Sequence, residues 1–582
     1  MREYSVPVLV DVPASAGLSD TVFKRAEQEP GAVIMRRKTD SGWPVVTASE
    51  FRDQVVGVAK GLIAAGISHG DRVALMSRTR YEWTLVDYAI WTVGAVTVPI
   101  YETSSVEQVR WILTDSEAKA VFVELDEHEE TVREAVPELK QVWRVDGALE
   151  AGDVSDAEVN RRREQVGIAD LATVVYTSGT TGRPKGCRIT HDNLLFTARN
   201  VLRGPLEPLF ATKDPAALLF LPLAHILARI IQVVLIEAGA VIAHTPNMKN
   251  VAPDLQDFKP TFLLGVPRVF EKVYNGAEQK AISGGKGKIF ASAVDVAMAS
   301  SRASAAGAPL GLRLKHLLFD RLVYTKLRAA TGGRLSAAVS GGGALGERLG
   351  HFFKGVGIEV FEGYGLTETT GPCTVNMPYG NKIGTVGKPL PGVSLRIGDD
   401  GEILAKGRNV FPGYWKNDEA TAEVIDAEGW FHTGDIGELD ADGYLRITGR
   451  KKEILVTAAG KNVAPGPLED ALRAHPLVSQ AMIVGDGRPF VAALITLDPE
   501  ALPDGASATE LRTDPAVLAQ VQEAVDRANL LVSKAEQIKK FMILDRDITE
   551  DSGHLTPTLK VKRNLVMRDF AKEIDGLYDG KH

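Results

Sequence analysis

The stretch "YTSGTTGRPKG", residues 176–186, follows the apolar run "LATVV" and has the composition of a loop that binds phosphate. Glycines let backbone N–H groups converge on an anion, hydroxyls add small donors, and a lysine adds positive charge. The stretch does not match the common phosphate loop G-x-x-x-x-G-K-[ST], because Arg183 and Pro184 separate Gly182 from Lys185. Taken alone it is equally typical of a surface turn, so the rest of the chain has to decide.

Length and charge narrow the class of protein. With 582 residues, 45% of them hydrophobic, the chain can form several structural units with large cores. Its formal net charge of -8 argues against an extended nucleic-acid surface. We therefore expect small-molecule chemistry and no nucleic-acid partner.

Neither a signal peptide nor a membrane span is expected. The N-terminal stretch "MREYSVPVLVDVPASAG" interrupts its apolar part with charges and prolines, and the longest apolar run, 230–244, contains Glu237 and is too short to cross a bilayer. Cys187 and Cys373 form no ligand cluster and are expected to be packing residues in a reducing compartment. We therefore expect a cytoplasmic protein.

The first half of the chain alternates between helical and strand patterns. A capping-box pattern from Thr47 to Glu50 begins an amphipathic helix over 47–66. Strands are expected at 72–77, 95–101 and 119–124, with helices between them. After the polar run "NRRREQ" near 160, a second series should contain the strands "LATVVY", "AALLFL", "AVIAH", "TFLLG" and "LSAAVSGG". Such alternation predicts two related α/β subdomains with parallel sheets.

The second half of the chain has a different pattern of secondary structure. From Val393 onward, short strands and tight turns, including a hairpin at Asp442-Gly443, predict a β-rich subdomain. The fold class is thus α/β, with a large N-terminal domain of two α/β subdomains plus a β-rich subdomain, and a smaller mobile α+β C-terminal domain. The expected domains are 1–449, with a helical insertion at about 276–332, a hinge at 450–453, and 454–582.

Four further motifs follow the opening loop. They are "GYGLTE" (363–368), "GWFHTGD" ending at Asp435, "ITGRKKE" with Arg450, and "TPTLKVKRN" with Lys560. In this order and spacing the chain resembles, over nearly its whole length, the adenylate-forming (AMP-binding) superfamily of acyl-CoA synthetases, luciferases and peptide-synthetase adenylation domains. The resemblance implies an enzyme whose carboxylate substrate attacks the α-phosphorus of ATP and expels pyrophosphate, which requires negative charge to be neutralised.

The resemblance also implies which residues handle the phosphates. The β- and γ-phosphates would be embraced by Thr177, Ser178, Gly179, Thr180, Thr181, Gly182 and Lys185. Thr367 would hold the α-phosphate. Glu368, together with Thr177, is the implied Mg²⁺ ligand, since a hard dication takes oxygen donors and needs few from protein. A solvent-exposed carboxylate is the alternative for Glu368.

The adenosine half of the nucleotide is assigned in the same way. Tyr364, beside Gly363, resembles the family's adenine shelf, and the stretch "SGGGAL" (340–345) would form the opposite wall. Asp435 would accept from both ribose hydroxyls, with Arg450 as its partner. The implied nucleotide-binding set also includes Gly341, Gly342, Glu362, Gly365 and Lys452. An ordinary turn is the alternative for Asp435.

Two further residues are implied at the reacting carboxylate. His225, in "LPLAHIL", matches a family position there, although a lone histidine on an apolar helix is often packed core. Lys560 resembles the lysine that reaches the bridging oxygens from the small domain. The family has glycine before this lysine, where this chain has Leu559, and Lys562 is an alternative; the spacing to Arg563 favours Lys560. A solvated basic tail is the other interpretation.

The family hands its adenylate to a thiol by swinging the small domain about a hinge residue, here Lys452. The swing would bring 456–465, with Gly460 and Lys461, to a coenzyme A tunnel. ATP, Mg²⁺ and coenzyme A are therefore the implied substrates and cofactors.

The stretches "LPLAHILAR", "KPTFLLGVPRVFEKVY" and "GKNVAPGPLED" resemble bacterial long-chain fatty acyl-CoA synthetases, which implies a long-chain fatty acid substrate. Arg229 stands where some such enzymes carry a tryptophan gate. Basic residues in 313–328 fit either a solvated helix face or a peripheral contact with anionic lipid at the inner membrane face. The competing functions are a fatty acyl-AMP ligase that serves a carrier protein, and a protein that only binds or hydrolyses nucleotide.

Overall fold

The computed structural model describes all residues except 178–182, 304–306, 504–505, 557–558 and 580–582. A six-stranded sheet has the order β7-β6-β4-β5-β8-β9, and only its β8–β9 pair is antiparallel. Its strands are β4 (Arg72–Met76), β5 (Val96–Ile100), β6 (Ala120–Val123), β7 (Gln141–Arg144), β8 (Leu171–Thr177) and β9 (Lys185–Thr190). The connecting helices are α2 (Ala48–Ala64), α3 (Tyr81–Thr92), α4 (Val106–Ser116), α5 (Asp126–Ala135) and α6 (Asp156–Arg163). The predicted capping box at Thr47 is present at the start of α2.

A nine-stranded sheet has the order β16-β15-β14-β13-β12-β10-β11-β2-β3, and its central part is parallel. Its strands are β2 (Val33–Arg36), β3 (Val45–Thr47), β10 (Ala216–Leu219), β11 (Val241–His244), β12 (Phe262–Gly265), β13 (Ala337–Ser340), β14 (Glu359–Leu366), β15 (Gly371–Val375) and β16 (Lys388–Pro389). Helices of this region are α1 (Asp20–Gln28), α7 (His191–Leu202), α8 (Glu207–Phe210), α9 (Ile226–Ala238), α10 (Val251–Phe258) and α15 (Glu347–Val356).

One predicted strand lies in the other sheet, and the second sheet gains a strand that the sequence analysis did not predict. The run "LATVVY" was expected in the second series, but β8 pairs with β5 of the first sheet. Conversely, β2 from the N-terminal segment pairs with β11 of the second sheet. Alternation of apolar residues identifies a buried strand, yet it does not specify which sheet edge that strand joins. The prediction was therefore correct for the elements and wrong for this partner.

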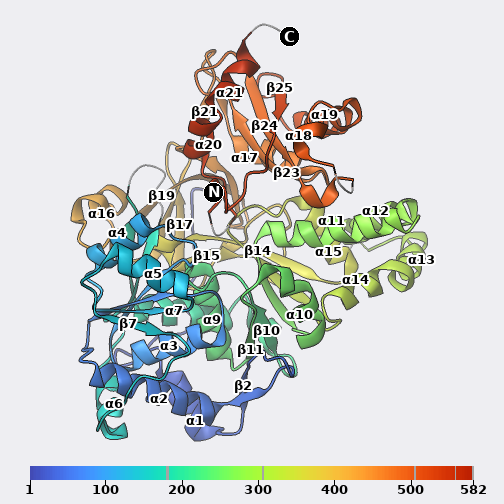
Figure 1. The fold of residues 1–582 in the computed structure, drawn as a ribbon. Helices are drawn as coiled ribbons and strands as arrows, with labels where there is room; N and C mark the ends of the chain where they lie inside the picture. Colours follow the sequence, from blue (N-terminus) through green and yellow to red (C-terminus); the bar gives the residue numbers. More distant parts are fainter. Residues whose placement is uncertain (178–182, 304–306, 504–505, 557–558, 580–582) are drawn as a thin grey trace.

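A run of helices projects from the nine-stranded sheet. It comprises α11 (Pro267–Ser283), α12 (Gly287–Ala303), α13 (Leu310–Phe319), a π-helical turn η2 (Asp320–Tyr324) and α14 (Thr325–Ala330). Figure 1 shows α12 and α13 at the periphery, on the side away from the six-stranded sheet. A cluster around Tyr274, Phe290 and Phe352 joins these helices to the large domain.

The β-rich subdomain follows. Its sheet has the order β1-β17-β18-β19-β20, with β1 (Glu3–Ser5), β17 (Val393–Ile397), β18 (Glu402–Gly407), β19 (Phe431–Leu439) and β20 (Leu445–Arg450). Helix α16 (Asp418–Val424) lies between β18 and β19 in the chain. The predicted hairpin joins β19 to β20, and Gly443 has φ +85°, a conformation that favours glycine.

The C-terminal part sits above the large domain in Figure 1. It contains the hairpin β21 (Leu455–Val456) and β22 (Asn462–Val463), and a sheet of β23 (Val478–Val484), β24 (Val491–Leu497) and β25 (Ile538–Ile543). Its helices are α17 (Pro465–Arg473), α18 (Ala508–Leu511), α19 (Pro515–Asn529), α20 (Arg563–Asp569) and α21 (Ala571–Tyr578). The buried residues of two apolar clusters all belong to this part. The predicted fold class is confirmed.

Polar contacts join the two parts. The Arg268 guanidinium lies 3.0 Å from Asp498 Oδ2, and Thr103 Oγ1 donates to Glu550 Oε1 at 2.9 Å. Within the described part of the chain, no helix has both the length and the apolar character that crossing a membrane requires.

Candidate active site

Three side chains from two sheets meet where the ribose ligand was predicted. Asp435 on β19 pairs in register with Arg450 at the end of β20, and Arg450 Nε donates to Asp435 Oδ1 at 3.0 Å. Tyr364 on β14 donates its hydroxyl to Asp435 Oδ2 at 2.6 Å. Burial and the Asp435 charge hold the pKa of Tyr364 well above its usual value, so its phenol remains a donor. Asp435 is thus an oriented anion at the junction of two sheets.

Glycines at the ends of β13 and β14 lie close to neighbouring backbone or side-chain atoms. A Cβ on Gly341 would lie 3.1 Å from Leu227 Cδ2, and a Cβ on Gly365 would lie 1.8 Å from the backbone oxygen of Gly371. Gly342 has φ +81°, and a Cβ on Gly363 would lie 3.1 Å from the Thr374 oxygen. The positions of Gly365 and Gly342 therefore favour glycine whether or not a nucleotide is bound, whereas a Cβ on Gly341 or Gly363 would need only a small shift of its neighbour.

Glu362 supports the proposed adenine wall from within the protein. Its Oε1 accepts from the backbone N–H of Leu345 at 2.8 Å, at the end of the "SGGGAL" stretch. Desolvation raises the pKa of Glu362 to about 7. Glu362 is therefore engaged in holding the loop.

The proposed phosphate end is built around Glu368. The Tyr414 hydroxyl donates to Glu368 Oε1 at 2.8 Å, and Lys185 Nζ lies 5.1 Å from the centre of the Tyr414 ring. Thr177 pairs with Lys185 across the β8–β9 hairpin. Thr367, partly buried, begins the single 3₁₀ turn that carries Glu368. The structure thus gathers Thr177, Lys185, Thr367 and Glu368 around the end of one hairpin.

The predicted loop residues Ser178, Gly179, Thr180, Thr181 and Gly182 lie outside the described residues. Tyr414 was missed by the sequence analysis, because nothing in "FPGYW" marks it as the partner of a carboxylate 46 positions away.

The donor set fits Mg²⁺ held mainly by substrate phosphates. No group of three or more histidine, cysteine or acidic side chains among the described residues is arranged to hold a metal. Glu368 and the Thr177 hydroxyl both lie beside the buried thiol of Cys187: burial and Glu368 raise the pKa of that thiol, and a hydrogen bond with Thr177 lowers it. One carboxylate with a neighbouring hydroxyl is typical of a magnesium ion that keeps its waters and binds phosphate.

Lys560 extends from the C-terminal part toward the same centre. The residue keeps access to solvent, yet the surrounding protein desolvates its ammonium. This desolvation, together with the Arg450 charge, lowers the pKa of Lys560. The charges of Asp435 and Glu453 oppose that lowering. Lys562 instead precedes Arg563, which is anchored in its own domain by Glu469 Oε1 at 2.5 Å. Lys560, rather than Lys562, therefore lies near enough to Arg450 and Asp435 for their charges to act on its ammonium.

His225 ends a loop rather than lying within a helix. It is the N-cap of α9, where its Nδ1 accepts from the backbone N–H of Leu227 at 3.2 Å. Desolvation, with a smaller effect from the Lys560 charge, lowers the pKa of His225 to about 3. The ring is therefore neutral near pH 7, and because Nδ1 accepts, Nε2 carries the proton.

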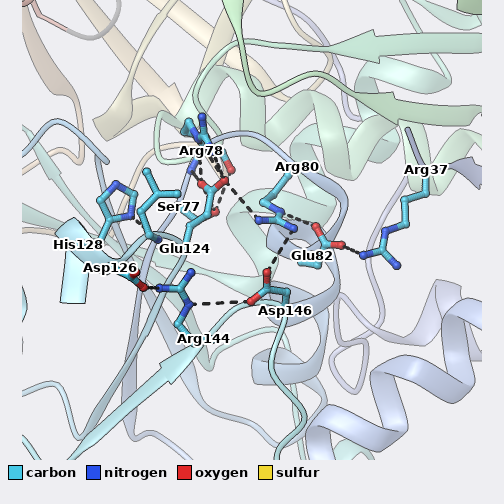
Figure 2. Close-up of polar contacts among 11 residues, drawn as sticks. Arg37, Ser77, Arg78, Arg80, Glu82, Glu124, Asp126, His128, Arg144 and Asp146 are labelled. Carbon is cyan, nitrogen blue, oxygen red and sulfur yellow. Dashed lines mark hydrogen bonds and ion pairs between the residues drawn. The ribbon is translucent and has the colours of Figure 1, made fainter. Parts of the chain in front are cut away.

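A network of charged side chains surrounds Glu124 (Figure 2), and a residue between two of its arginines contacts the loop that carries His225. Glu124, buried at the end of β6, accepts from Arg78 Nη2 at 2.6 Å and from Arg80 Nη1 at 3.3 Å, and Arg80 Nε also donates to Glu82. Between these two arginines, Thr79 donates to the Leu221 oxygen at 2.7 Å, four residues before His225. Figure 2 shows each of these arginines facing a carboxylate, so the network is structural.

Arg229 points into the core. Both it and Asp87 are fully buried; Arg229 Nε donates to Asp87 Oδ2 at 3.0 Å, and the guanidinium lies 5.3 Å and 5.0 Å from the rings of Trp83 and Trp91. Burial raises the pKa of Asp87 and the Arg229 charge opposes that rise. Arg229 is thus a clamped core residue in this structure.

The residues predicted to bind coenzyme A lie on the β21–β22 hairpin. Gly460 has φ +76° in its turn, and Lys461 Nζ is 3.5 Å from Glu536 Oε1 of the same domain. Lys452 lies in the exposed turn between β20 and β21. The contact given for Lys461 is thus made within the C-terminal part.

Comparison with known proteins gives the same family along the chain. The model described as "AMP-binding enzyme" matches residues 22–415, and that described as "AMP-binding enzyme C-terminal domain" matches residues 452–582. Proteins named long-chain-fatty-acid--CoA ligase FadD15, from Mycobacterium bovis and Mycobacterium tuberculosis, are 51% identical to this chain. Each match covers 100% of this chain and 100% of the relative. The human long-chain-fatty-acid--CoA ligase ACSBG1 is 31% identical over 93% of this chain and 82% of its own.

Solved structures agree in fold. The anthranilate CoA ligase AuaEII in complex with anthranoyl-AMP has a TM-score of 0.73 at 20% identity, covering 97% of this chain and 99% of that one. The A-PCP didomain of carboxylic acid reductase from Segniliparus rugosus, in complex with AMP, has a TM-score of 0.76 at 20% identity. That match covers 99% of this chain and 84% of that one. From its full-length relatives and its two matched domains, this chain belongs to the AMP-binding enzyme family.

Proposed function

We propose that this protein is a long-chain fatty acid–CoA ligase, which converts a fatty acid, ATP and coenzyme A to acyl-CoA, AMP and pyrophosphate through an acyl-adenylate. Full-length relatives at 51% identity carry that activity in their names. The observation that carries the proposal is the Tyr364–Asp435–Arg450 cluster. Lys560, from the C-terminal part, lies near enough to this cluster and to His225 for their charges to act on one another. This supports the assignment of an ammonium from one domain to the nucleotide and carboxylate positions of the other.

In the first step, a carboxylate oxygen of the fatty acid attacks the α-phosphorus of ATP, and the bond to pyrophosphate breaks. Asp435 accepts from the ribose hydroxyls, which fixes the α-phosphorus relative to Thr367. His225 donates from Nε2 to the attacking carboxylate and stays neutral, so it orients the carboxylate without neutralising it. Lys560 donates to the oxygens between carboxylate and phosphorus, where negative charge gathers in the transition state.

The phosphate end disperses the charge of the leaving group. Thr177 and Lys185, with Ser178 to Gly182, hold the β- and γ-phosphates. Glu368 would hold Mg²⁺, and the bound ion would supply positive charge that neutralises the phosphates. The Tyr414 hydroxyl keeps Glu368 oriented, and its raised pKa, caused mainly by burial, keeps it a donor. Departing pyrophosphate would thus leave beside the ammonium of Lys185.

In the second step, the sulfur of coenzyme A attacks the acyl carbon, the bond to AMP breaks, and the thiol proton passes to solvent. We place the domain boundary at 450–453, where β20 ends in an exposed turn, and Lys452 at the hinge. Rotation there withdraws Lys560 and presents Gly460 and Lys461, on the β21–β22 hairpin, to the pantetheine arm. Because proline restricts φ and the preceding residue, Lys452→Pro should spare adenylation and slow thioester formation.

Long-chain specificity is assigned to apolar burial near His225 and residues 261–267. Each methylene that leaves water contributes about 0.8 kcal/mol, so kcat/KM should rise with chain length to a maximum at about twelve to eighteen carbons. A maximum at acetate, benzoate or an amino acid would contradict the substrate class and leave the adenylation chemistry standing.

One assay tests the reaction. The protein is incubated with ATP, Mg²⁺, coenzyme A and single fatty acids, and acyl-CoA, AMP and pyrophosphate are quantified by chromatography. We expect equal amounts of all three. Pyrophosphate without consumption of coenzyme A would indicate an acyl-AMP ligase, and release of phosphate with ADP would indicate a hydrolase. Lys560→Ala should make acyl-adenylate roughly 10²- to 10³-fold more slowly and still convert supplied acyl-adenylate to thioester; Lys562→Ala is the matched control.

A further inference from the structure

Helix α13 exposes a row of leucines. Leu310, Leu314, Leu317 and Leu318 are 73%, 61%, 67% and 57% exposed, and Leu322, in the π-helical turn that follows, is 49% exposed. At about 100° per residue, the four leucines of α13 fall within an arc of about 100° on the helix surface. Soluble monomers rarely leave a contiguous apolar stripe of this kind without a partner.

The opposite side of α13 is already used for packing. His316 Nε2 lies 2.7 Å from the backbone oxygen of Gly355, and Phe319 packs against the apolar cluster of the large domain. In the next turn, the buried Tyr324 donates its hydroxyl to the Ala293 oxygen at 2.6 Å. The helix is therefore fixed to the domain with its leucines outward, and Figure 1 shows it at the edge of the molecule.

Positive charge surrounds the stripe. Residues 280–330 contain nine lysines and arginines against two aspartates, an excess of seven positive charges in a chain whose formal charge is -8. Arg313 and Lys315 are exposed and, at about 100° per residue, lie on the two sides of the stripe. One of the aspartates, Asp320, is engaged by Arg328 Nη1 at 2.8 Å. An apolar face bordered by cations is the pattern of a helix that lies in a membrane interface.

We propose that α13 and its π-helical turn dock this protein on the surface of an anionic lipid bilayer, with the leucines among the acyl chains and Arg313 and Lys315 at headgroup phosphates. A second copy of the chain fits less well, because a two-fold contact would bring two strongly positive segments together. The inference goes beyond the proposed function, although it would place the helical segment where long-chain acids are concentrated.

The test measures binding to vesicles without ATP or coenzyme A, so its result is independent of catalysis. Wild-type protein is sedimented with vesicles of phosphatidylcholine, with and without phosphatidylglycerol. The triple variant Leu314→Gln, Leu317→Gln and Leu318→Gln removes the centre of the stripe. The matched control is Leu530→Gln with Leu531→Gln, which changes leucines that are 85% and 65% exposed in the C-terminal domain.

We expect wild type and control to bind anionic vesicles. Each leucine that inserts should strengthen partitioning by about fivefold or more, so the triple variant should bind at least about 100-fold more weakly. Arg313→Gln with Lys315→Gln should lose about 25-fold on anionic vesicles and little on phosphatidylcholine, and added salt should weaken wild-type binding. All variants should keep their thermal unfolding midpoint and their adenylation rate with octanoate.

Three outcomes would overturn the proposal. One is wild-type protein that does not sediment with anionic vesicles, and another is a triple variant that binds as wild type does. The third is a wild-type dimer in sedimentation equilibrium that the triple variant converts to monomer, since the stripe would then be an interface between copies of the chain. Loss of octanoate activity in a variant that still binds vesicles would bear on the ligase and leave membrane docking intact.

Discussion

Leu559, immediately before Lys560, offers a quantitative test of how the two domains are held in this orientation. It adopts φ +62°, the left-handed region that costs an ordinary residue about 1–2 kcal/mol and that the glycine of related motifs adopts freely. Its half-buried side chain packs against the cluster around Tyr274, Phe290 and Phe352, which belongs to the large domain. It also packs against an apolar cluster of the C-terminal domain. The chain thus keeps a strained leucine where it bridges the two domains.

Two substitutions separate the strain from the contact. Fully burying a leucine is worth about 1.5–3 kcal/mol, so the half of this side chain that faces the large domain should contribute about 1 kcal/mol to the present orientation. Leu559→Ala and Leu559→Gly both remove that contact, and adenylation kcat/KM should fall about fivefold in each. Only glycine relieves the strain, so its free energy of unfolding should exceed that of the alanine variant by about 1 kcal/mol.

The assay follows the half-reactions separately. Adenylation is measured by pyrophosphate release, thioester formation from supplied acyl-adenylate and coenzyme A, and stability by urea unfolding. Thioester formation should hold its wild-type rate, because the contact belongs to the orientation that this step leaves. If both half-reactions slow equally, Leu559 supports the C-terminal fold alone; if adenylation is unchanged, the contact gives no preference between orientations.

Three further predictions concern single side chains. Arg229→Ala should lower the free energy of unfolding by about 3–5 kcal/mol in denaturant titrations, because it leaves Asp87 charged and buried, and Arg229→Ala with Asp87→Ala should recover part of that loss; an effect below about 1 kcal/mol would mean that Asp87 is already neutral. Glu362 has a folded pKa raised to about 7 against about 4.5 unfolded, so the stability it contributes is complete below pH 4.5 and is lost as pH rises to 7. Wild type should therefore lose up to about 1.4 kcal/mol per pH unit over this window relative to Glu362→Gln, and parallel pH profiles would refute the assignment. His225→Asn should keep the N-cap of α9 and unfold within about 0.5 kcal/mol of wild type while adenylating at least about tenfold more slowly, whereas an unchanged rate would show that the cap is the residue's whole role.

The sequence predicted local structure better than long-range partners. The helix that begins at Thr47 and the hairpin at Gly443 follow from residue types a few positions apart, and both are present. Sheet membership depends on contacts between residues far apart in the sequence, and neither the pairing of β8 with β5 nor that of β2 with β11 leaves a local signal.

The candidate site divides in the same way. Motif residues such as Asp435 and Arg450 could be named because they stand in short stretches that resemble the motifs of a known family. Tyr414, which orients Glu368, and Thr79, which holds the loop before His225, could not, because each acts through one hydrogen bond made by the fold. The burial of Arg229 between two tryptophans was equally beyond a sequence reading, since an arginine within an apolar helix gives no indication of its partner.

Arg450 has two structural roles. It is the last residue of β20, where its Nε donates to Asp435, and it precedes the turn that leads into the C-terminal part. Under the proposed function, in which Asp435 holds the ribose and the hinge lies at 450–453, a bound nucleotide would also stiffen that hinge. Thermodynamic reciprocity requires that, if rotation weakens AMP affinity by some factor, bound AMP must disfavour rotation by that same factor. Release of AMP and rotation of the C-terminal domain are then coupled. A substitution that weakens the hold of Arg450 on Asp435 should therefore change both AMP affinity and the rotation equilibrium.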